Sequence, residues 1–417
     1  MMHENQPETF LAEETFHRSQ STLADSDRSC VLSFVFPCLN EEATLGDCIR
    51  QVKTALAGAL IDHEIVVADN GSTDRSIEIA RENGCRIINV PRRGYGAALQ
   101  GGINAALGRY VAFADSDNTY LYQHTPALFE AARRHQAGMA IASRMIGDIE
   151  PGAMPFLHRH LGTPVLTALI NLLFCGQLTD CNSGFRCIEK AEYTKWGVQS
   201  DGMEFASELL IRALKAKSTI VEIPSGLRRD LPGRKAHLKT WQDGMRHLLF
   251  ILSEKPALFE WLGILLFVPS TLLAAFAGFS GPLTLGRFNI FDLHSQAILL
   301  LGAVVATQFY VFGCSLFLSS PDKPTPLTRR IIDLNEGTLF FTLLGVLATT
   351  VLIVSGLVVT WATAGFGGLH HAHRLLTAVH FLSVAAMGSI GLLSIHTLKK
   401  RRSAGKPPAT HTSPTPV

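Results

Sequence analysis

The sequence predicts an α/β domain with a mostly parallel sheet, followed by an α-helical domain of four membrane-spanning helices. Two observations carry this prediction. In the first half of the chain, short apolar runs alternate with segments of helical spacing, which is the pattern of βαβ units and a parallel sheet. From residue 258 onward, four apolar runs of roughly twenty residues follow, each long enough to cross a bilayer.

Four buried strands are expected ahead of Asp115, because four short runs are apolar and β-branched enough to be covered on both faces. They lie at 31–36, 63–68, 85–90 and 110–114, with helical spacing at 44–60, at 76–83 and from Gly94 onward. Each run ends in a polar or glycine-rich cluster. The carboxyl ends of parallel strands meet at one sheet edge, where ligands bind, so the clusters predict a nucleotide site. They are Asn40-Glu41, Asp69-Asn70-Gly71, Gly94-x-Gly96 and Asp115-x-Asp117.

Asp115 and Asp117 follow the fourth strand directly. A buried strand that ends in Asp-x-Asp brings both carboxylates to the rim of the sheet, where they can share one hard divalent cation, Mg²⁺ or Mn²⁺. That cation can in turn hold a diphosphate. Asp-Ser-Asp is also ordinary turn chemistry, and it is the neighbouring clusters that favour the metal site.

The glycines of these clusters have predicted roles of their own. Gly71 allows a tight turn, and Gly94 and Gly96 let the backbone approach a ligand ahead of a helix N-terminus. A simple loop-to-helix turn is the alternative for Gly94 and Gly96. Asp69 either accepts hydrogen bonds from a base or ribose, or closes an Asx-turn before Gly71.

Composition narrows the range of partners. The net charge is only +2, which gives no indication of nucleic acid binding. The eight cysteines contain no C-x-x-C pair, so free thiols are expected. The first 29 residues are polar and acidic, without the pattern of a signal peptide, so the α/β domain is expected on the cytoplasmic side.

The second half of the chain predicts a multi-pass protein of the inner or plasma membrane. The four spans are expected at 258–279, 295–318, 338–361 and 376–398. Basic residues concentrate in the loop between spans two and three and after span four, which places both, and the α/β domain, in the cytoplasm. The amphipathic segment before the first span suits a helix that lies in the membrane interface, or one that packs on the α/β domain.

The predicted divisions of the chain follow from these observations. They are a disordered tail at 1–29, the α/β domain at 30–235, an interfacial amphipathic helix at 236–257, the transmembrane domain at 258–398 and a disordered cytoplasmic tail at 399–417.

The order and spacing of several blocks resemble glycosyltransferase family 2, in particular its dolichol- or polyprenyl-phosphate mannose (glucose) synthase branch. The blocks of the nucleotide-sugar half are Pro37-x-x-Asn40-Glu41, Asp69-x-Gly71-Ser72-x-Asp74 and Asp115-x-Asp117. Those similar to the synthase branch are Ala142-Ser143-Arg144, Asp180–Arg186 and Gly202–Glu208. The resemblance spans about residues 31–255 and implies the GT-A fold. The sequence lacks the Gln-x-x-Arg-Trp motif of the processive synthases, which argues against chitin, cellulose or hyaluronan synthesis.

The resemblance implies a nucleoside diphosphate sugar across the sheet edge, with Asp115 and Asp117 as metal ligands. It implies Asp117 and Arg144 as catalytic residues, and Arg144 and Arg159 as ligands of the acceptor phosphate. The implied donor-binding residues are Pro37, Leu39, Asn40, Glu41, Asp69, Gly71, Gly94, Gly96, Asp115, Arg228 and Arg229.

Three features qualify this correspondence. Thr119 stands where the mannose synthases carry Gln, and Leu39 stands where relatives carry Tyr. Arg228 and Arg229, together with Arg234 and Lys235, form a basic loop that either closes over the donor diphosphate or is held to anionic lipid.

The expected activity is inverting, metal-dependent transfer of a sugar to a polyprenyl phosphate, whose oxygen is already an anion and needs little general-base help. Two alternatives stay open. One is transfer to a lipid or glycan hydroxyl in cell-envelope biosynthesis, with Asp180 or Glu204 as base. The other is a non-catalytic membrane scaffold, which the retained charges at the sheet edge argue against. Glu204 and Glu208 lie four apart on a helix and face either the site or solvent. The sugar, the nucleotide base, the prenyl chain length and a homo-oligomer are left open.

Overall fold

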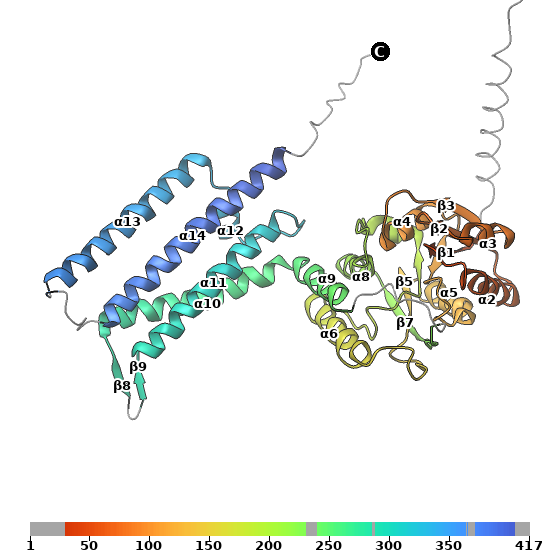
Figure 1. Cartoon of the computed structure of the whole chain (residues 1–417), viewed down its shortest axis with the longest axis horizontal. Helices are drawn as coiled ribbons and strands as arrows, with labels where there is room; N and C mark the ends of the chain where they lie inside the picture. The colour runs from red at the N-terminus through yellow and green to blue at the C-terminus, as the bar shows by residue number, and fades with distance from the viewer. Residues whose placement is uncertain (1–29, 231–239, 286–287, 364, 366–371, 405–417) are drawn as a thin grey trace, which may run out of the picture. The chain divides into compact units, whose positions relative to one another are not determined.

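The computed structural model describes residues 30–230, 240–285, 288–363, 365 and 372–404 (Figure 1). The chain divides into two compact units, one that ends at Ile251 and one that begins at Leu252. We call the first, where the sequence predicts the catalytic residues, the catalytic unit, and the second the helical unit. The tails expected at 1–29 and beyond 404, and the basic residues Arg234 and Lys235, lie outside the described residues.

In the described part of the catalytic unit, seven strands form one sheet in the order β3-β2-β1-β4-β6-β5-β7. The strands are β1 Leu32–Cys38, β2 His63–Asp69, β3 Arg86–Asn89, β4 Tyr110–Phe113, β5 Met139–Ser143, β6 Arg186–Glu189 and β7 Ile220–Pro224. Only β6 runs antiparallel to its neighbours, β4 and β5. The first four strands are the four that the sequence predicts, and the mostly parallel sheet is confirmed.

Helices cover both faces of this sheet (Figure 1). They are α2 Leu45–Gly58, α3 Ser76–Glu82, α4 Tyr95–Ala105, α5 Thr125–Arg134, α6 Thr163–Phe174, α7 Lys190–Trp196 and α8 Phe205–Lys215. Alternate residues of β1 enter two different cores: Val35 packs with α4 and α8, whereas Phe34 and Phe36 pack with α2 and α5. Every residue of β1 is buried, as expected of a central strand covered on both faces.

Helix α9 (Thr240–Ser253) occupies the segment predicted to be an interfacial amphipathic helix. Its His247 is buried and its Nδ1 lies 2.7 Å from the Ser207 hydroxyl in α8, and Ile251 is fully buried in the core. Met245 and Leu249 are more than half exposed. Part of α9 therefore packs on the catalytic unit, and a second, apolar face stays uncovered.

The helical unit contains four helices, among the described residues, that are long and apolar enough to cross a membrane. They are α10 Pro256–Ser280, α11 Leu293–Phe317, α13 Glu336–Thr363 and α14 Ala372–Ala404. They match the four predicted spans. A hairpin of β8 (Leu283–Leu285) and β9 (Phe288–Ile290) and the short helix α12 (Pro326–Ile332), none of them predicted, lie between them along the chain.

The fourth helix continues past the predicted end at residue 398 as far as Ala404, so the first part of the expected tail is helical. Two lysines at this end are paired: Lys399 with Asp333 at 2.8 Å and Lys400 with Glu336 at 2.9 Å. These contacts fix the last turns of α14 against the residues that follow α12 and begin α13.

Candidate active site

The candidate site lies at the carboxyl edge of β1, β2 and β4, where the sequence predicts it. Cys38 at the end of β1 pairs with Asp69 at the end of β2, and β4 pairs with the other side of β1. The Ser116 hydroxyl donates to the carbonyl of Pro37 at 2.9 Å, which ties the Asp-x-Asp loop to the end of β1.

The loops after β1 and β2 hold each other through side chain to backbone hydrogen bonds. Asn40, in the left-handed region at φ 60°, accepts a 2.8 Å bond from the Thr73 amide through Oδ1. The Glu41 amide donates to Ser76 Oγ at 2.8 Å, and the Glu42 amide donates to the Asp74 carboxylate. The Asn40-Glu41 block thus shapes the rim of the site.

Asp69 closes a turn in this structure. Its carboxylate accepts bonds from the amides of Gly71 at 3.1 Å and Ser72 at 3.0 Å, which is the Asx-turn alternative. Gly71 has φ 92°, and the guanidinium of Arg93 lies so close to it that a Cβ would meet its Nη1 at 2.4 Å. The turn that Gly71 was predicted to allow is therefore present.

Gly94 and Gly96 leave room for a backbone segment of the same chain. A Cβ at Gly94, where φ is 134°, would lie 2.1 Å from the carbonyl oxygen of Asp201, and one at Gly96 would lie 2.2 Å from that of Ser200. The Ala97 amide donates to Asp201 O at 3.1 Å. In this structure the close backbone approach is to residues 200–202 of the same chain, and a role of these glycines in donor binding stays a prediction.

The two carboxylates of the Asp-x-Asp loop differ in their surroundings. Asp117 Oδ1 accepts bonds from the amide and the hydroxyl of Thr119, at 3.1 and 2.7 Å. Asp115 Oδ1 is buried and has no hydrogen-bond partner among the described residues. Burial and the neighbouring Asp117 carboxylate raise the pKa of Asp115 to about 7, against the opposing effects of the Tyr95 hydroxyl and of Arg144.

This carboxylate pair fits a divalent cation. A buried, unpaired oxygen next to a second carboxylate costs free energy that a bound cation would offset. No group of three or more His, Cys, Asp or Glu side chains suited to a metal ion occurs among the residues described. Asp115 and Asp117 would therefore be the protein's ligands, and Thr119, where Gln stands in the mannose synthases, orients Asp117 through hydrogen bonds.

Arg144 lies beside this pair and is itself held rigidly. Its Nε and Nη2 donate to the two oxygens of Asp180 at 2.7 and 2.9 Å, and its own amide donates to Asp180 as well. Asp180 is fully buried. The Arg144 guanidinium and the hydrogen bonds from the Arg144 and Asn182 amides lower the pKa of the Asp180 carboxyl in spite of burial. The guanidinium Nη1 of Arg144 takes no part in the bidentate contact with Asp180. The Arg144 charge is close enough to Asp115 to oppose the rise in the Asp115 pKa.

The π-helical turn η2 (His158–Gly162) carries the second predicted phosphate ligand, Arg159. Arg159 is exposed, and its neighbour His158 lies close enough to Arg144 for that charge, after burial, to lower the His158 pKa. Large apolar side chains are exposed on η2, just before it and on α6: Phe156, Leu157, Leu161, Val165 and Leu172. The predicted phosphate ligands thus border an uncovered apolar surface.

The two arginines that follow β7 separate in the structure. The Arg228 amide donates to the carbonyl of Thr119 at 2.8 Å, and its side chain reaches Gln51 and Gln123, so it lies against the loop that carries Asp117. The Arg229 amide instead donates to the Glu150 carboxylate at 3.0 Å. Of the predicted donor-binding pair, only Arg228 is brought to the metal loop.

Several site residues were given no role by sequence reasoning. Tyr120 Oη accepts from the Gly184 amide at 2.7 Å, and a Cβ on Gly184 would lie 2.9 Å from Asp115 Oδ2. Arg186, only 1% exposed, donates three 2.8 Å bonds to backbone carbonyls, two of them in the segment that precedes Gly184. Gly184 and Arg186 belong to the Asp180–Arg186 block seen in the sequence, but the contacts of Gly184 with Tyr120 and Asp115 could not be predicted from it.

Asp180 and Glu204, the two bases predicted for a hydroxyl acceptor, and Glu208, which lies on the same helix as Glu204, have different surroundings. Asp180 is buried, paired with Arg144 and lowered in pKa, so it does not fit the role of a general base. Glu208 is 2% exposed and accepts from the amides of Gln199 and Ser200, so it faces neither the site nor solvent. Glu204 is half-buried at the start of α8.

Comparisons with known proteins show the family of this chain. The family model for glycosyl transferase family 2 matches residues 33–193. The low-salt glycan biosynthesis hexosyltransferase Agl6 of Haloferax volcanii is 35% identical over 354 residues, which cover 83% of this chain and 84% of that protein. The chain belongs to glycosyltransferase family 2. The protein is thus a glycosyltransferase with the GT-A-type α/β fold, followed by four apolar helices.

Two further comparisons each cover about half of the chain. A dolichyl-phosphate hexose transferase of Haloferax volcanii is 30% identical over 198 residues, or 46% of this chain and 81% of that protein. The crystal structure of glucosyl-3-phosphoglycerate synthase from Mycobacterium tuberculosis with Mn²⁺ and UDP-glucose is 24% identical and covers 54% of this chain and 78% of that one, with a TM-score of 0.43.

Proposed function

We propose that this glycosyltransferase is an integral membrane protein that transfers a hexose from a nucleoside diphosphate sugar to a polyprenyl phosphate, with inversion and with a divalent metal. The observation that carries the proposal is the buried, unpaired Oδ1 of Asp115 beside Asp117 and Arg144. A Mg²⁺ or Mn²⁺ ion held by the two carboxylates would neutralise charge on the leaving diphosphate.

The acceptor side of the proposal rests on charge and on apolar surface. Arg144 is fixed by Asp180, and Arg159 lies on an exposed turn bordered by uncovered Phe156 and Leu161. Cationic side chains beside an apolar surface suit a ligand with a phosphate head and a hydrocarbon tail. The dolichyl-phosphate hexose transferase relative supports this acceptor class.

The other charged residues of the site, Asp180 and Arg228, would orient the reactants rather than transfer protons. The acceptor phosphate oxygen is an anion and attacks without a base, which agrees with a site whose one fully buried carboxylate, Asp180, holds Arg144 in place. Arg228, placed against the Asp117 loop, would contact the donor diphosphate. The four apolar helices would cross the membrane, with the catalytic unit in the cytoplasm.

A transfer assay tests the proposal. Full-length protein in detergent is incubated with undecaprenyl phosphate, Mg²⁺ or Mn²⁺, and a panel of labelled UDP- and GDP-sugars. Label is expected in a lipid-phosphate product. Hydrolysis or binding of a donor without labelled lipid phosphate would contradict the acceptor and favour a hydroxyl acceptor instead, and binding of no donor would favour the scaffold alternative.

A pair of variants tests the metal site within the same assay. Asp117→Ala is expected to lower turnover by at least about a hundredfold, because it removes one of two carboxylate ligands. Asp62→Ala removes an exposed carboxylate just before β2, away from the carboxyl edge, and is expected to leave turnover unchanged. Full activity of Asp117→Ala would contradict the metal site.

A further inference from the structure

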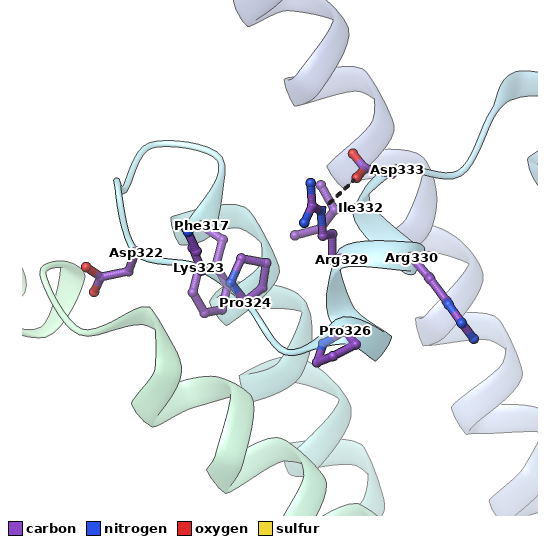
Figure 2. A pocket seen from close by; sticks show the side chains of 9 residues that line it. All are labelled: Phe317, Asp322, Lys323, Pro324, Pro326, Arg329, Arg330, Ile332 and Asp333. Atoms are coloured by element: carbon purple, nitrogen blue, oxygen red, sulfur yellow. Dashed lines mark ion pairs between the residues drawn. The ribbon is translucent and has the colours of Figure 1, made fainter.

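One end of the helical unit carries two adjoining hollows whose walls combine cations with apolar side chains. The first, of about 640 Å³, is lined by Lys323, Arg329 and Arg330 together with Phe317 and Ile332 (Figure 2). The second, of about 500 Å³, is a groove between α13 and α14. Asp333 in the lining of the first pairs with Lys399, and the next residue, Lys400, lines the second and pairs with Glu336.

The frame of the first hollow is held by buried polar contacts. Glu260 of α10 is 2% exposed and accepts from the amide of Thr325, the N-cap of α12, at 3.1 Å. The Tyr310 and Thr328 hydroxyls of α11 and α12 lie 2.6 Å apart. Lys399 of α14 donates to the Ile332 carbonyl, near the end of α12, at 3.0 Å. Helix α12 is thus attached to three neighbouring helices, and its position is defined.

The cations on this frame are in excess of their partners. Lys323, Arg330 and Arg401 form no ion pair with any residue that the structure describes. Arg329 is 3.8 Å from Asp333 and 76% exposed, and Figure 2 shows Arg330 directed away from that pair. The first hollow is also lined by the carboxylates of Asp322 and Asp333, so the rim presents an excess of cations over anions rather than positive charge alone.

The groove between α13 and α14 is apolar along most of its length. Its apolar lining is Leu339, Phe340, Leu343 and Leu393, and its polar lining is Glu336, His396, Thr397, Lys400 and Arg401, of which Lys400 is paired with Glu336. Of the residues of α13, only Leu339 is buried. An apolar groove that ends in cations is complementary to an amphiphile with an anionic head and a hydrocarbon chain.

We infer that this end of the helical unit binds an anionic phospholipid of the surrounding bilayer, with its headgroup on the rim of Lys323, Arg330 and Arg401 and an acyl chain along the groove. The inference rests on the proposed membrane insertion and is independent of the reaction. The rim cations are exposed and spread over two hollows. A site selective for one phosphate monoester would instead enclose it with buried, convergent donors, so bulk anionic phospholipid fits better than a prenyl phosphate.

The test measures retained lipid. Full-length protein is reconstituted with equal amounts of phosphatidylglycerol and phosphatidylcholine, extracted into mild detergent, and analysed by native mass spectrometry. The protein is expected to retain phosphatidylglycerol preferentially. Arg330→Gln and Arg401→Gln are each expected to weaken retention by about fivefold, as follows from the loss of one cation near the headgroup. Arg374→Gln, which removes an exposed cation near the other end of α14, serves as the matched control.

Three results would overturn the inference. They are equal retention of the two phospholipids, equal loss in the Arg374→Gln control, and preferential retention of undecaprenyl phosphate when it competes at the same mole fraction. Transfer activity is measured on the same samples and is expected to be unchanged in Arg330→Gln and Arg401→Gln. A failure of the proposed reaction would appear there and leave the lipid result standing.

Discussion

Strand β1 and helix α13 are both strongly apolar, yet all seven residues of β1 are buried and only Leu339 of α13 is. In β1, protein covers the apolar side chains on both faces, and polar groups are gathered at the edge of the sheet where the strand ends. In α13 nearly all of the apolar surface is exposed, as suits a helix that crosses a membrane. An apolar side chain in β1 therefore contributes to the free energy of folding through burial, whereas one on the exposed surface of α13 does not. Matched substitutions in the two units can test this difference.

The largest difference is expected for the loss of a carboxylate. Asp180→Asn in the catalytic unit leaves Arg144 buried without its partner and is expected to destabilise that unit by about 3–5 kcal/mol. Asp333→Asn in the helical unit breaks the Lys399 pair, which is exposed, and is expected to cost less than about 1 kcal/mol. Urea denaturation in detergent, followed by hydrogen exchange in each unit, measures both. Equal effects would show that the Arg144 pair is not a buried one.

Core packing gives the next largest contrast. Leu56→Ala in α2 removes a fully buried side chain and is expected to destabilise the catalytic unit by about 2–5 kcal/mol. Leu352→Ala in α13 removes a side chain that is 72% exposed, and its effect is expected within about 0.5 kcal/mol. The same denaturation experiment compares them. A large effect of Leu352→Ala would indicate that another protein surface, such as a second copy of the chain, covers α13.

The first four strands, the four apolar helices and the Asp-x-Asp loop could all be predicted, because each depends on the periodicity, length or spacing of residues that are close together in the sequence. The pairing of β6 between β4 and β5 could not, since antiparallel insertion depends on contacts distant in sequence. The Asp180–Arg144 pair links two blocks 36 residues apart, and the block motif shows neither the contact nor its burial. Whether Arg159 and Arg228 bind phosphate stays a prediction.

Gly96 has a contact in the structure that its local sequence does not predict. Its spacing after a strand is typical of a ligand-binding turn, whereas the residues that it actually contacts, Ser200 and Phe205, lie about a hundred positions later in the chain. The glycine spacing after a strand indicates that a side chain would not fit at residue 96, but only the tertiary structure shows which atoms lie there.

Glycine replacement is expected to have a smaller effect than the loss of core side chains. Gly96→Ala brings a Cβ to 2.2 Å from the Ser200 carbonyl oxygen, which must move, and is expected to cost about 1–3 kcal/mol. Gly356→Ala in α13 meets nothing within 4 Å and is expected to be neutral or to stabilise its helix by up to about 1 kcal/mol. Thermal denaturation of the two variants in detergent compares them. A neutral Gly96→Ala would show that the backbone at Ser200 can move away from residue 96 at no cost.

The smallest expected effect is the pH dependence of metal binding, which belongs to the catalytic unit alone. Because burial and Asp117 raise the pKa of Asp115 to about 7, its carboxyl keeps a proton that a cation must displace at lower pH. Mn²⁺ affinity is therefore expected to rise about tenfold between pH 6 and pH 8 and then to level off. Calorimetric titration with Mn²⁺ measures this, and an affinity that is constant between pH 6 and pH 8 would contradict the raised pKa.

The same group has the opposite effect on stability, and this separates the site from a general pH response. The folded pKa of Asp115 lies above its unfolded value of about 3.9, so the folded state holds the proton more tightly. The stability of the metal-free protein is then expected to fall as the pH rises from about 4 to about 7, and to stay constant above that range. Asp115→Asn is expected to remove both this loss and the Mn²⁺ binding. It should raise the unfolding temperature of the metal-free catalytic unit at pH 8 and leave hydrogen exchange in α13 unchanged. A lower unfolding temperature in Asp115→Asn would mean that the unpaired Oδ1 is satisfied within the protein.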